Sequence, residues 1–391
     1  MNQNESQSTV REMMMEFARE TGLSPVRKSL RRYLWTDAFA VCNFLELYHQ
    51  TGEETYLNLA LQLVDQVHHT LGRHRKDDSR TGWISGLGEQ EGGRYPTRGG
   101  LRIGKELKER GIHDPFDERL EWDRDGQYYH YLTKWMHALS RVSRVTGDLI
   151  YNTWAIELAK TAHAGFVYAS PSSGPKRMYW KMSIDLSRPL VQSMGHHDPL
   201  DGFVTYNELQ ATGEKDPRES IGRNLRAEIA DIANICDGKN WETDDPLGIG
   251  GLLFDACWVA QLIVRGDLEQ IGLLETLLDS SLIGLKSFVR EDSLKLPVGY
   301  RLAFRELGLS IGLRAVEKVR GLMDQKSQSS WKKDSLPSLL KALSRYVGLK
   351  EIIETFWLER TNMESASWIA HRDINMVMLA TSLAPDGFLK L

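Results

Sequence analysis

The sequence repeats one short phrase at junctions between helical patterns. Residues 48–60 read YHQTGEETYLNLA, residues 144–155 read RVTGDLIYNTWA, and residues 209–214 read LQATGE. In the first two, an amphipathic segment ends at Thr-Gly-acid and another periodic segment follows, and the third has the same ending. Glycine after a last turn can take the left-handed conformation that ends a helix, and the acid then lies in the first turn of the next helix. The phrase therefore predicts repeated αα-hairpins.

Twelve helical segments can be placed around these junctions. Six are apolar around most of their circumference, which is typical of helices at the centre of a large all-α protein; they cover residues 34–50, 126–146, 199–212, 246–264, 300–316 and 366–383. The other six have a one-sided apolar stripe and suit an outer layer; they cover residues 7–21, 54–71, 150–168, 217–236, 267–289 and 335–358. The alternation predicts an all-α fold, a single (α/α)6 toroid domain over residues 1–391, with an irregular α-solenoid as the alternative.

Charge and composition narrow the choice of partners. The net charge of −4 argues against a nucleic-acid partner. No apolar run approaches the roughly 20 residues that a bilayer span needs, and the first ten residues lack the basic start and apolar stretch of a signal peptide. Scattered Cys42, Cys236 and Cys257 stand in apolar context, which indicates buried thiols in a reducing compartment. We therefore expect a cytoplasmic protein with no membrane partner; whether it forms a homo-oligomer stays open.

Short polar segments, called here polar tags, stand at the starts of five of the six central helices. They cover residues 35–39, 121–129, 195–203, 242–251 and 370–376. Acids at such positions can cap free N–H groups and complement the positive helix end, which is the simpler explanation for any single aspartate. Aromatic and histidine residues accompany these acids, however. Because all central helices of a six-hairpin toroid begin at one end, we expect the tags to converge around one funnel.

Two connections are much longer than the Thr-Gly turns. Residues 73–124 and 169–195 each join an outer helix to the next central one, which places both at the end with the polar tags, and loops of this length are usually functional. The first contains GGRYPTRGGLRIGK, in which Arg94, Arg98 and Arg102 offer guanidinium donors to a carboxylate, phosphate or sulfate, with Lys105 beside them. Pairing of these arginines with the acids of residues 117–125 is the alternative.

Two segments resemble a known family. The sequence LWTDAFAVCNFLELYHQTGEETYLNLALQLVDQV resembles the first hairpin of six-hairpin glycosidases, most closely the unsaturated glucuronyl and rhamnogalacturonyl hydrolases. The run HDPLDGF over residues 197–203 is similar to their H-D-x-G-F motif, which carries a catalytic aspartate. The resemblance implies an (α/α)6 fold and hydrolysis of an acidic sugar. The same fold also hosts N-acylglucosamine 2-epimerases and related sugar isomerases, so the fold alone does not select the activity.

The chain departs from the family pattern in ways that affect the site. Ala38 stands in place of the glycine of the first motif, and two extra residues separate Asp198 from Gly202. The resemblance therefore leaves open whether Asp198 or Asp201 is the acid. The run also begins the third central helix, whereas the resemblance would place it on the second, where other aspartates stand, namely Asp123 and Asp125.

Glycoside cleavage requires two carboxyl groups on opposite sides of the bond, a proton donor and a base or nucleophile. We predict Asp125 as the general acid/base, since Gly126 beside it lets substrate approach, and Asp198 as its partner. The alternative is that both only cap helices. The candidate catalytic residues are thus Asp125, Asp198, Asp123 and Asp201. The candidate substrate-binding residues are Trp35, Asp37, Arg94, Arg98, Trp122, Tyr128, His196, His197, His371 and Arg372.

Two other functions remain open at this point. Sugar isomerisation or epimerisation requires bases with a pKa near neutrality, which His196 or His197 together with His371 would supply. A non-catalytic toroid could instead bind a glycan or a protein through the same funnel. Adjacent His196, His197 and Asp198 lack the spacing of zinc ligands, and phosphate-binding glycine motifs are missing from the sequence, so we expect neither metal nor cofactor.

Overall fold

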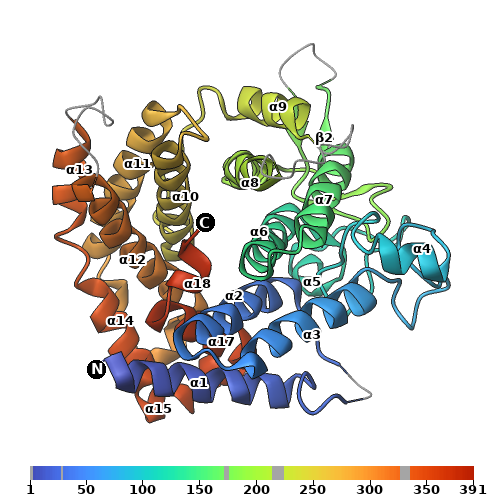
Figure 1. Ribbon diagram of the computed structural model, residues 1–391, viewed down its shortest axis with the longest axis horizontal. Helices are drawn as coiled ribbons and strands as arrows, with labels where there is room; N and C mark the ends of the chain where they lie inside the picture. The colour runs from blue at the N-terminus through green and yellow to red at the C-terminus, as the bar shows by residue number, and fades with distance from the viewer. Residues whose placement is uncertain (1–2, 28–29, 171–175, 214–223, 326–334) are drawn as a thin grey trace. The chain divides into compact units, whose positions relative to one another are not determined.

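The computed structural model describes residues 3–27, 30–170, 176–213, 224–325 and 335–391 (Figure 1). It divides into two compact units. One comprises Ala18–Asp237 and is called here the 18–237 unit; the other comprises Met1–Phe17 and Gly238–Leu391 and is called the 238–391 unit. Each is described by itself.

The 18–237 unit is built from three helical hairpins. They pair α2 (Leu34–Thr51) with α3 (Glu54–Leu71), α6 (Tyr129–Thr146) with α7 (Ile150–Phe166), and α8 (Asp198–Gly213) with α9 (Arg226–Cys236). Helix α6 packs against both α2 and α8, so these three form one inner layer (Figure 1). Every residue from Leu34 to Leu47 of α2 is buried, whereas α3 buries a single stripe. This difference matches the predicted central and outer classes.

In the first two hairpins the glycines of the Thr-Gly-acid turns end their helices as predicted. The acids, Glu53 and Asp148, do not lie in the first turn of the next helix, because α3 begins at Glu54 and α7 at Ile150. Gly52 and Gly147 have left-handed φ angles of 70° and 75°, where a side chain would be strained. The threonine adds a contact that the sequence did not suggest: Thr51 Oγ1 accepts a hydrogen bond from the N–H of Glu53, at 3.1 Å. The third turn runs into Glu214, outside the described residues.

The 238–391 unit holds the remaining helices. Helix α12 (Ala303–Gln325) packs against α10 (Pro246–Arg265) and α17 (Arg372–Leu383). Helix α11 (Ile271–Arg290) pairs with α10, and α14 (Leu349–Leu358) with α12. The other elements are α1 (Gln3–Glu20, whose last residues belong to the 18–237 unit), α13 (Ser335–Leu343), α15 (Arg360–Met363), α16 (Ala366–Ile369), α18 (Asp386–Leu389), and the 3-10 turns η1 (Ser293–Lys295) and η2 (Val298–Tyr300).

All twelve predicted segments coincide with helices, which confirms the all-α class. Their boundaries differ in places. The segment 335–358 is divided into α13 and α14, and the segment 366–383 into α16 and α17. The segment 300–316 begins as a helix only at Ala303, and residues 217–223 lie outside the described part. The prediction that no apolar run could span a bilayer is wrong. By length and composition α10 could do so, although most of it is buried inside its unit. That the whole chain forms one domain stays a prediction.

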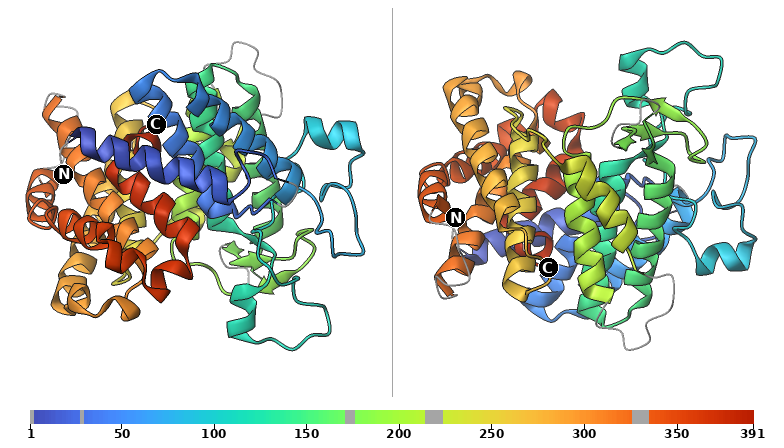
Figure 2. Two further views of the ribbon diagram at one scale, coloured as in Figure 1. Left: turned by 90° about the horizontal axis from the view of Figure 1, so that it is seen from below. Right: turned by 90° about the horizontal axis from the view of Figure 1, so that it is seen from above.

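Short strands join the two long connections of the 18–237 unit. β1 (Gln127–Tyr128) pairs antiparallel with β4 (Lys181–Met182), which pairs with β5 (Pro189–Val191); β2 (Val167–Tyr168) pairs with β3 (Arg177–Met178). The first connection also contains α4 (Glu89–Arg94) and α5 (Glu118–Asp123). In both views of Figure 2 the teal segment with α5 lies beside the green strands. These strands have only two or three residues, too few to show a period in the sequence.

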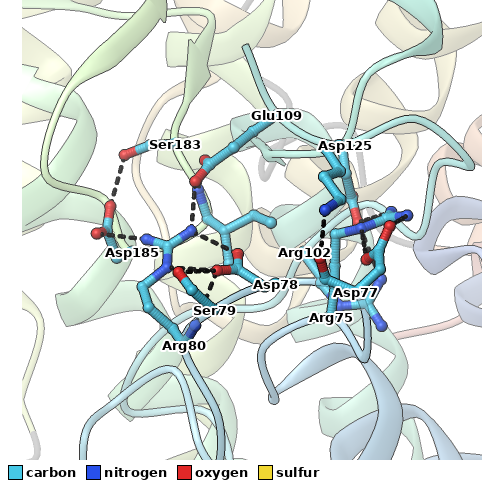
Figure 3. Close-up of polar contacts among 12 residues, drawn as sticks. Arg75, Asp77, Asp78, Ser79, Arg80, Arg102, Glu109, Asp125, Ser183 and Asp185 are labelled. Carbon is cyan, nitrogen blue, oxygen red and sulfur yellow. Dashed lines mark hydrogen bonds and ion pairs between the residues drawn. The ribbon is translucent and has the colours of Figure 1, made fainter. Parts of the chain in front are cut away.

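Ion pairs also join the two long connections to each other. Arg80 donates to the carboxylates of Asp78, Glu109 and Asp185, at 2.8, 2.5 and 2.8 Å (Figure 3). Glu109 in turn accepts the backbone N–H of Ile184 at 2.7 Å. Residues 73–124 and 169–195 therefore contact each other, as their predicted place at one end of the hairpins requires.

Candidate functional site

The first residues of the three inner helices bring one group of side chains together. His130 is the second residue of α6, Asp198 the first of α8, and Trp35 the second of α2. The His130 Nδ1 atom lies 3.3 Å from Asp198 Oδ1. With the aromatic residues around the imidazole they form what we call the histidine cluster: Trp35, Tyr128, His130, Tyr131, Trp180 and Asp198.

Aromatic rings enclose the imidazole of His130. The ring of Tyr128 is stacked on it with centroids 5.4 Å apart, and that of Trp180 is nearly parallel at 6.5 Å. Tyr131 and Trp35 meet it edge-on, at 4.9 and 6.1 Å. The His130 side chain nevertheless keeps 23% of its surface exposed. The imidazole is therefore enclosed by rings and still reachable from solvent, whereas Trp35, Tyr128 and Asp198 are buried.

Four buried polar atoms of this cluster have no hydrogen-bond partner among the described residues: Trp35 Nε1, Tyr128 OH, His130 Nδ1 and Asp198 Oδ2. The approach of His130 Nδ1 to Asp198 Oδ1 at 3.3 Å is an ion-pair contact and not a hydrogen bond in this structure. Buried polar atoms are nearly always paired, so several orphans in one group of contacting side chains mark a place for water or a ligand. Aromatic faces with a few convergent polar groups are the usual lining of a small-molecule site.

The Tyr128 hydroxyl of this cluster stays protonated and can donate a hydrogen bond. Burial, together with the nearby Tyr33 and two carboxylates, raises the pKa of the Tyr128 hydroxyl well above its ordinary value. The Lys181 Nζ atom lies 5.2 Å from the centroid of the Tyr128 ring and donates to the carbonyl oxygens of Glu121 and Arg124, at 2.6 and 2.8 Å. Lys181 of β4 thus holds the end of α5, just before β1.

The predicted general acid, Asp125, is held in a different set of contacts (Figure 3). Its side chain is fully buried, and its Oδ2 accepts from Arg75 and Arg102, at 3.2 and 2.9 Å. Its Oδ1 accepts backbone N–H groups, including that of Gly104 at 2.9 Å. These are the contacts of a carboxylate that holds a loop together. Its assignment as general acid stays a prediction that this geometry does not favour.

The remaining predicted aspartates have separate surroundings. Asp37 accepts the N–H of Tyr33 at 3.0 Å and so caps the start of α2. Asp201 pairs with Lys134 at 3.0 Å, one turn beyond the His130–Asp198 pair, and Asp123 is exposed. Of the four predicted catalytic carboxylates, only Asp198 lies in the histidine cluster.

The predicted histidines and arginines are distributed over both units. His196 and His197 lie just before α8, with ring centroids 4.6 Å apart. His371 and Arg372 begin α17 in the 238–391 unit, where the His371 ring lies 5.5 Å from that of Phe304 and Arg372 pairs with Glu16. The pairing of these histidines stays a prediction.

Arg98 contacts helix α7, and both Arg94 and Arg98 lie against the ring of Tyr95. None of these contacts is with the acids of residues 117–125. Arg98 pairs with Glu157 on α7 at 3.0 Å, and its guanidinium lies 3.8 Å from the centroid of the Tyr95 ring. Arg94 lies over the same ring at 5.5 Å. Arg102, by contrast, pairs with Asp125 and realises the alternative given above for these arginines. Within the described residues, no group of three or more metal-ligating side chains is present.

His130 is the residue that sequence reasoning missed. It comes immediately after Tyr128 and Tyr129, which end the tag EWDRDGQYY. That neighbourhood was a usable signal, because the aromatic residues were already candidates and a histidine at the start of a helix shares their environment. The orphan polar atoms, which distinguish the cluster most clearly, have no signature in the sequence.

Comparison with known proteins establishes the fold class. No protein-family model matches the sequence, and no curated protein matches it. The chain is similar to the solved structure of a GH76A α-1,6-mannanase from Salegentibacter sp. HEL1_6, with 12% identity, 98% of this chain and 99% of that chain covered, and a TM-score of 0.52. It is also similar to a sugar epimerase from a ruminal bacterium, with 9% identity, 98% of each chain covered and a TM-score of 0.51.

Identities this low show the fold alone. They confirm the predicted (α/α)6 toroid class for this chain. The narrower resemblance to unsaturated glucuronyl and rhamnogalacturonyl hydrolases is not shown by these structures.

Proposed function

We propose that this protein is a carbohydrate-active enzyme in which His130, held by Asp198, transfers a proton on a sugar. The observation that carries the proposal is the group of four orphan polar atoms among aromatic rings. Aromatic faces pack against the C–H faces of a pyranose, and the polar atoms would bind its hydroxyl groups. Two proteins of the same fold class are named as a sugar epimerase and a mannanase, which supports a sugar as the substrate.

The contacts favour proton transfer by an imidazole over glycoside hydrolysis. Hydrolysis requires two available carboxyl groups facing each other across the bond. Asp125 and Asp201 are engaged by arginines and by a lysine, and Asp37 caps a helix. The histidine cluster instead offers one imidazole and one carboxylate in contact. We therefore propose proton transfer of the kind that sugar isomerases and epimerases carry out.

The step follows from the chemistry of the paired groups. Asp198 faces Nδ1 of His130 and would hold the proton there, which leaves Nε2 as the base. Nε2 takes the proton from the carbon beside the carbonyl of an open-chain sugar. The C–H electron pair forms the C=C bond of an enediolate, and the carbonyl π pair moves to oxygen. The imidazolium then returns the proton to the other of the two carbons, while the hydroxyl proton passes through water from one oxygen of the enediolate to the other, so that the new carbonyl forms on the neighbouring carbon.

The orphan donors suit the charge that develops in this step. The Trp35 Nε1–H and Tyr128 O–H groups are buried and without a described partner, so they are free to donate to the enediolate oxygen. Donors aimed at a developing charge in a water-poor site are a major source of rate enhancement. Because burial raises the pKa of Tyr128, its hydroxyl stays protonated throughout the neutral range.

The experiment is to incubate the protein in D₂O with aldoses and ketoses and with saturated and unsaturated uronide oligosaccharides. We expect deuterium to enter a free sugar beside its carbonyl without new reducing ends. His130→Asn should lower this exchange by about 10²–10⁴-fold, the usual worth of a general acid/base. His49→Asn is the matched control, since His49 is exposed near the other end of α2.

Glycoside hydrolysis of an acidic sugar is the second candidate function, because Asp198 Oδ2 is unpartnered and Asp123 is exposed. New reducing ends from the uronides, retained in His130→Asn and lost in Asp198→Asn, would replace the first proposal by this one. The absence of any reaction with the wild-type protein would contradict both.

A further inference from the structure

Trp122 extends the aromatic rings of the histidine cluster to the surface. Its ring meets that of Trp180 edge-on, with centroids 4.8 Å apart, and lies 6.5 Å from that of Tyr128. Trp180 is in turn nearly parallel to His130, at an interplanar angle of 12°. Trp122 itself is 47% exposed. A continuous row of rings therefore leads from the imidazole to solvent.

This exposed indole is carried by a firmly held turn. Trp122 lies in α5, where the Asp117 carboxylate accepts the N–H of Leu120 at 3.0 Å. Glu121, the preceding residue, pairs with Arg110 and Lys181 at 3.1 and 3.0 Å. A rigid aromatic platform loses little conformational entropy when a ligand binds, and this is how proteins gain affinity by preorganisation.

We propose that Trp122 and Trp180 form a second sugar-binding subsite, so that the substrate has at least two sugar rings. The inference rests on the proposed function, which places the reacting ring at His130. A reacting sugar at the exposed part of the His130 imidazole would direct its neighbouring unit along the row of rings toward Trp180 and Trp122. The exposed face of the indole suits the apolar face of a pyranose.

The test compares two sugar sizes in one pair of variants. The probes are cellobiose with glucose and α-1,6-mannobiose with mannose, and the measurement is the ratio of disaccharide to monosaccharide Kd by titration calorimetry. We expect Trp122→Ala to raise this ratio about tenfold, which corresponds to about 1.4 kcal/mol. Phe116→Ala is the matched control and should leave the ratio unaltered. Phe116 is 57% exposed in the same segment, but its ring lies under the guanidinium of Arg110.

The outcomes separate this inference from the proposed function. A Trp122→Ala variant that keeps the wild-type ratio, or a wild-type protein that binds no disaccharide more tightly than its monosaccharide, would overturn the subsite. A shifted ratio with full turnover in His130→Asn would keep the subsite and overturn the role of His130. Failure of the wild-type protein to bind any of the four sugars would overturn both.

Discussion

Replacement of Asp125 by asparagine separates the structural role of this residue from the catalytic one predicted by sequence. The carboxylate is fully buried between Arg75 and Arg102, which keep only 13% and 12% of their side-chain surface exposed. Removing one partner of a buried ion pair typically costs about 3–5 kcal/mol, because the other charge is left uncompensated. Asparagine retains one oxygen for the backbone N–H groups, and both arginines keep carbonyl partners, so we expect about 3 kcal/mol.

The assay is thermal unfolding followed by circular dichroism. At roughly 2–4 °C per kcal/mol for a unit of this size, Asp125→Asn should lower Tm by about 6–12 °C. Asp123→Asn is the control, because Asp123 is exposed two residues earlier and a surface change of this kind usually costs less than about 0.5 kcal/mol. An unchanged Tm together with lost turnover in Asp125→Asn would refute the reasoning and restore Asp125 as the general acid.

Two further predictions concern stability. Burial lowers the pKa of His68 to about 3, and its Nε2 accepts from Trp135 Nε1 at 3.2 Å. The imidazole of the unfolded chain takes up a proton near pH 6.5, whereas that of the folded protein does not. The free energy of unfolding measured with urea should therefore fall as the pH drops from about 6.5 toward 3, and it should fall less steeply in His68→Gln. Equal slopes in the two proteins would contradict this. Gly250→Ala should lower the free energy of unfolding by about 1–3 kcal/mol, because the added Cβ would collide with the carbonyl of Gly308. Gly251→Ala is the control, since its Cβ meets open space and should be neutral or stabilising. Equal urea midpoints for the two variants would contradict this.

The helices were predictable because their signals are local. Apolar periodicity and the Thr-Gly turns are read over a few residues, and Gly52 and Gly147 take the conformation that such turns need. The break between α13 and α14 and the two-residue strands carry no comparable signal.

The site was predicted only in part because its contacts join distant residues. Trp35, Tyr128 and Asp198 were candidates, since each stands at the start of a central helix. Their role depends on His130, which lies 68 positions before Asp198 and which a helical pattern alone does not distinguish. Similarly, the contacts of Asp125 with Arg75 and Arg102, which lie 50 and 23 positions away, have no signal in the sequence.

A crystal structure soaked with a reducing sugar tests the central claim most directly. The account predicts a sugar ring against the histidine cluster, with hydroxyl or carbonyl oxygens within hydrogen-bond distance of His130 Nε2, Trp35 Nε1 and Tyr128 OH. A sugar bound elsewhere and flanked by two carboxylates, or a histidine cluster that stays empty at saturating sugar, would contradict it.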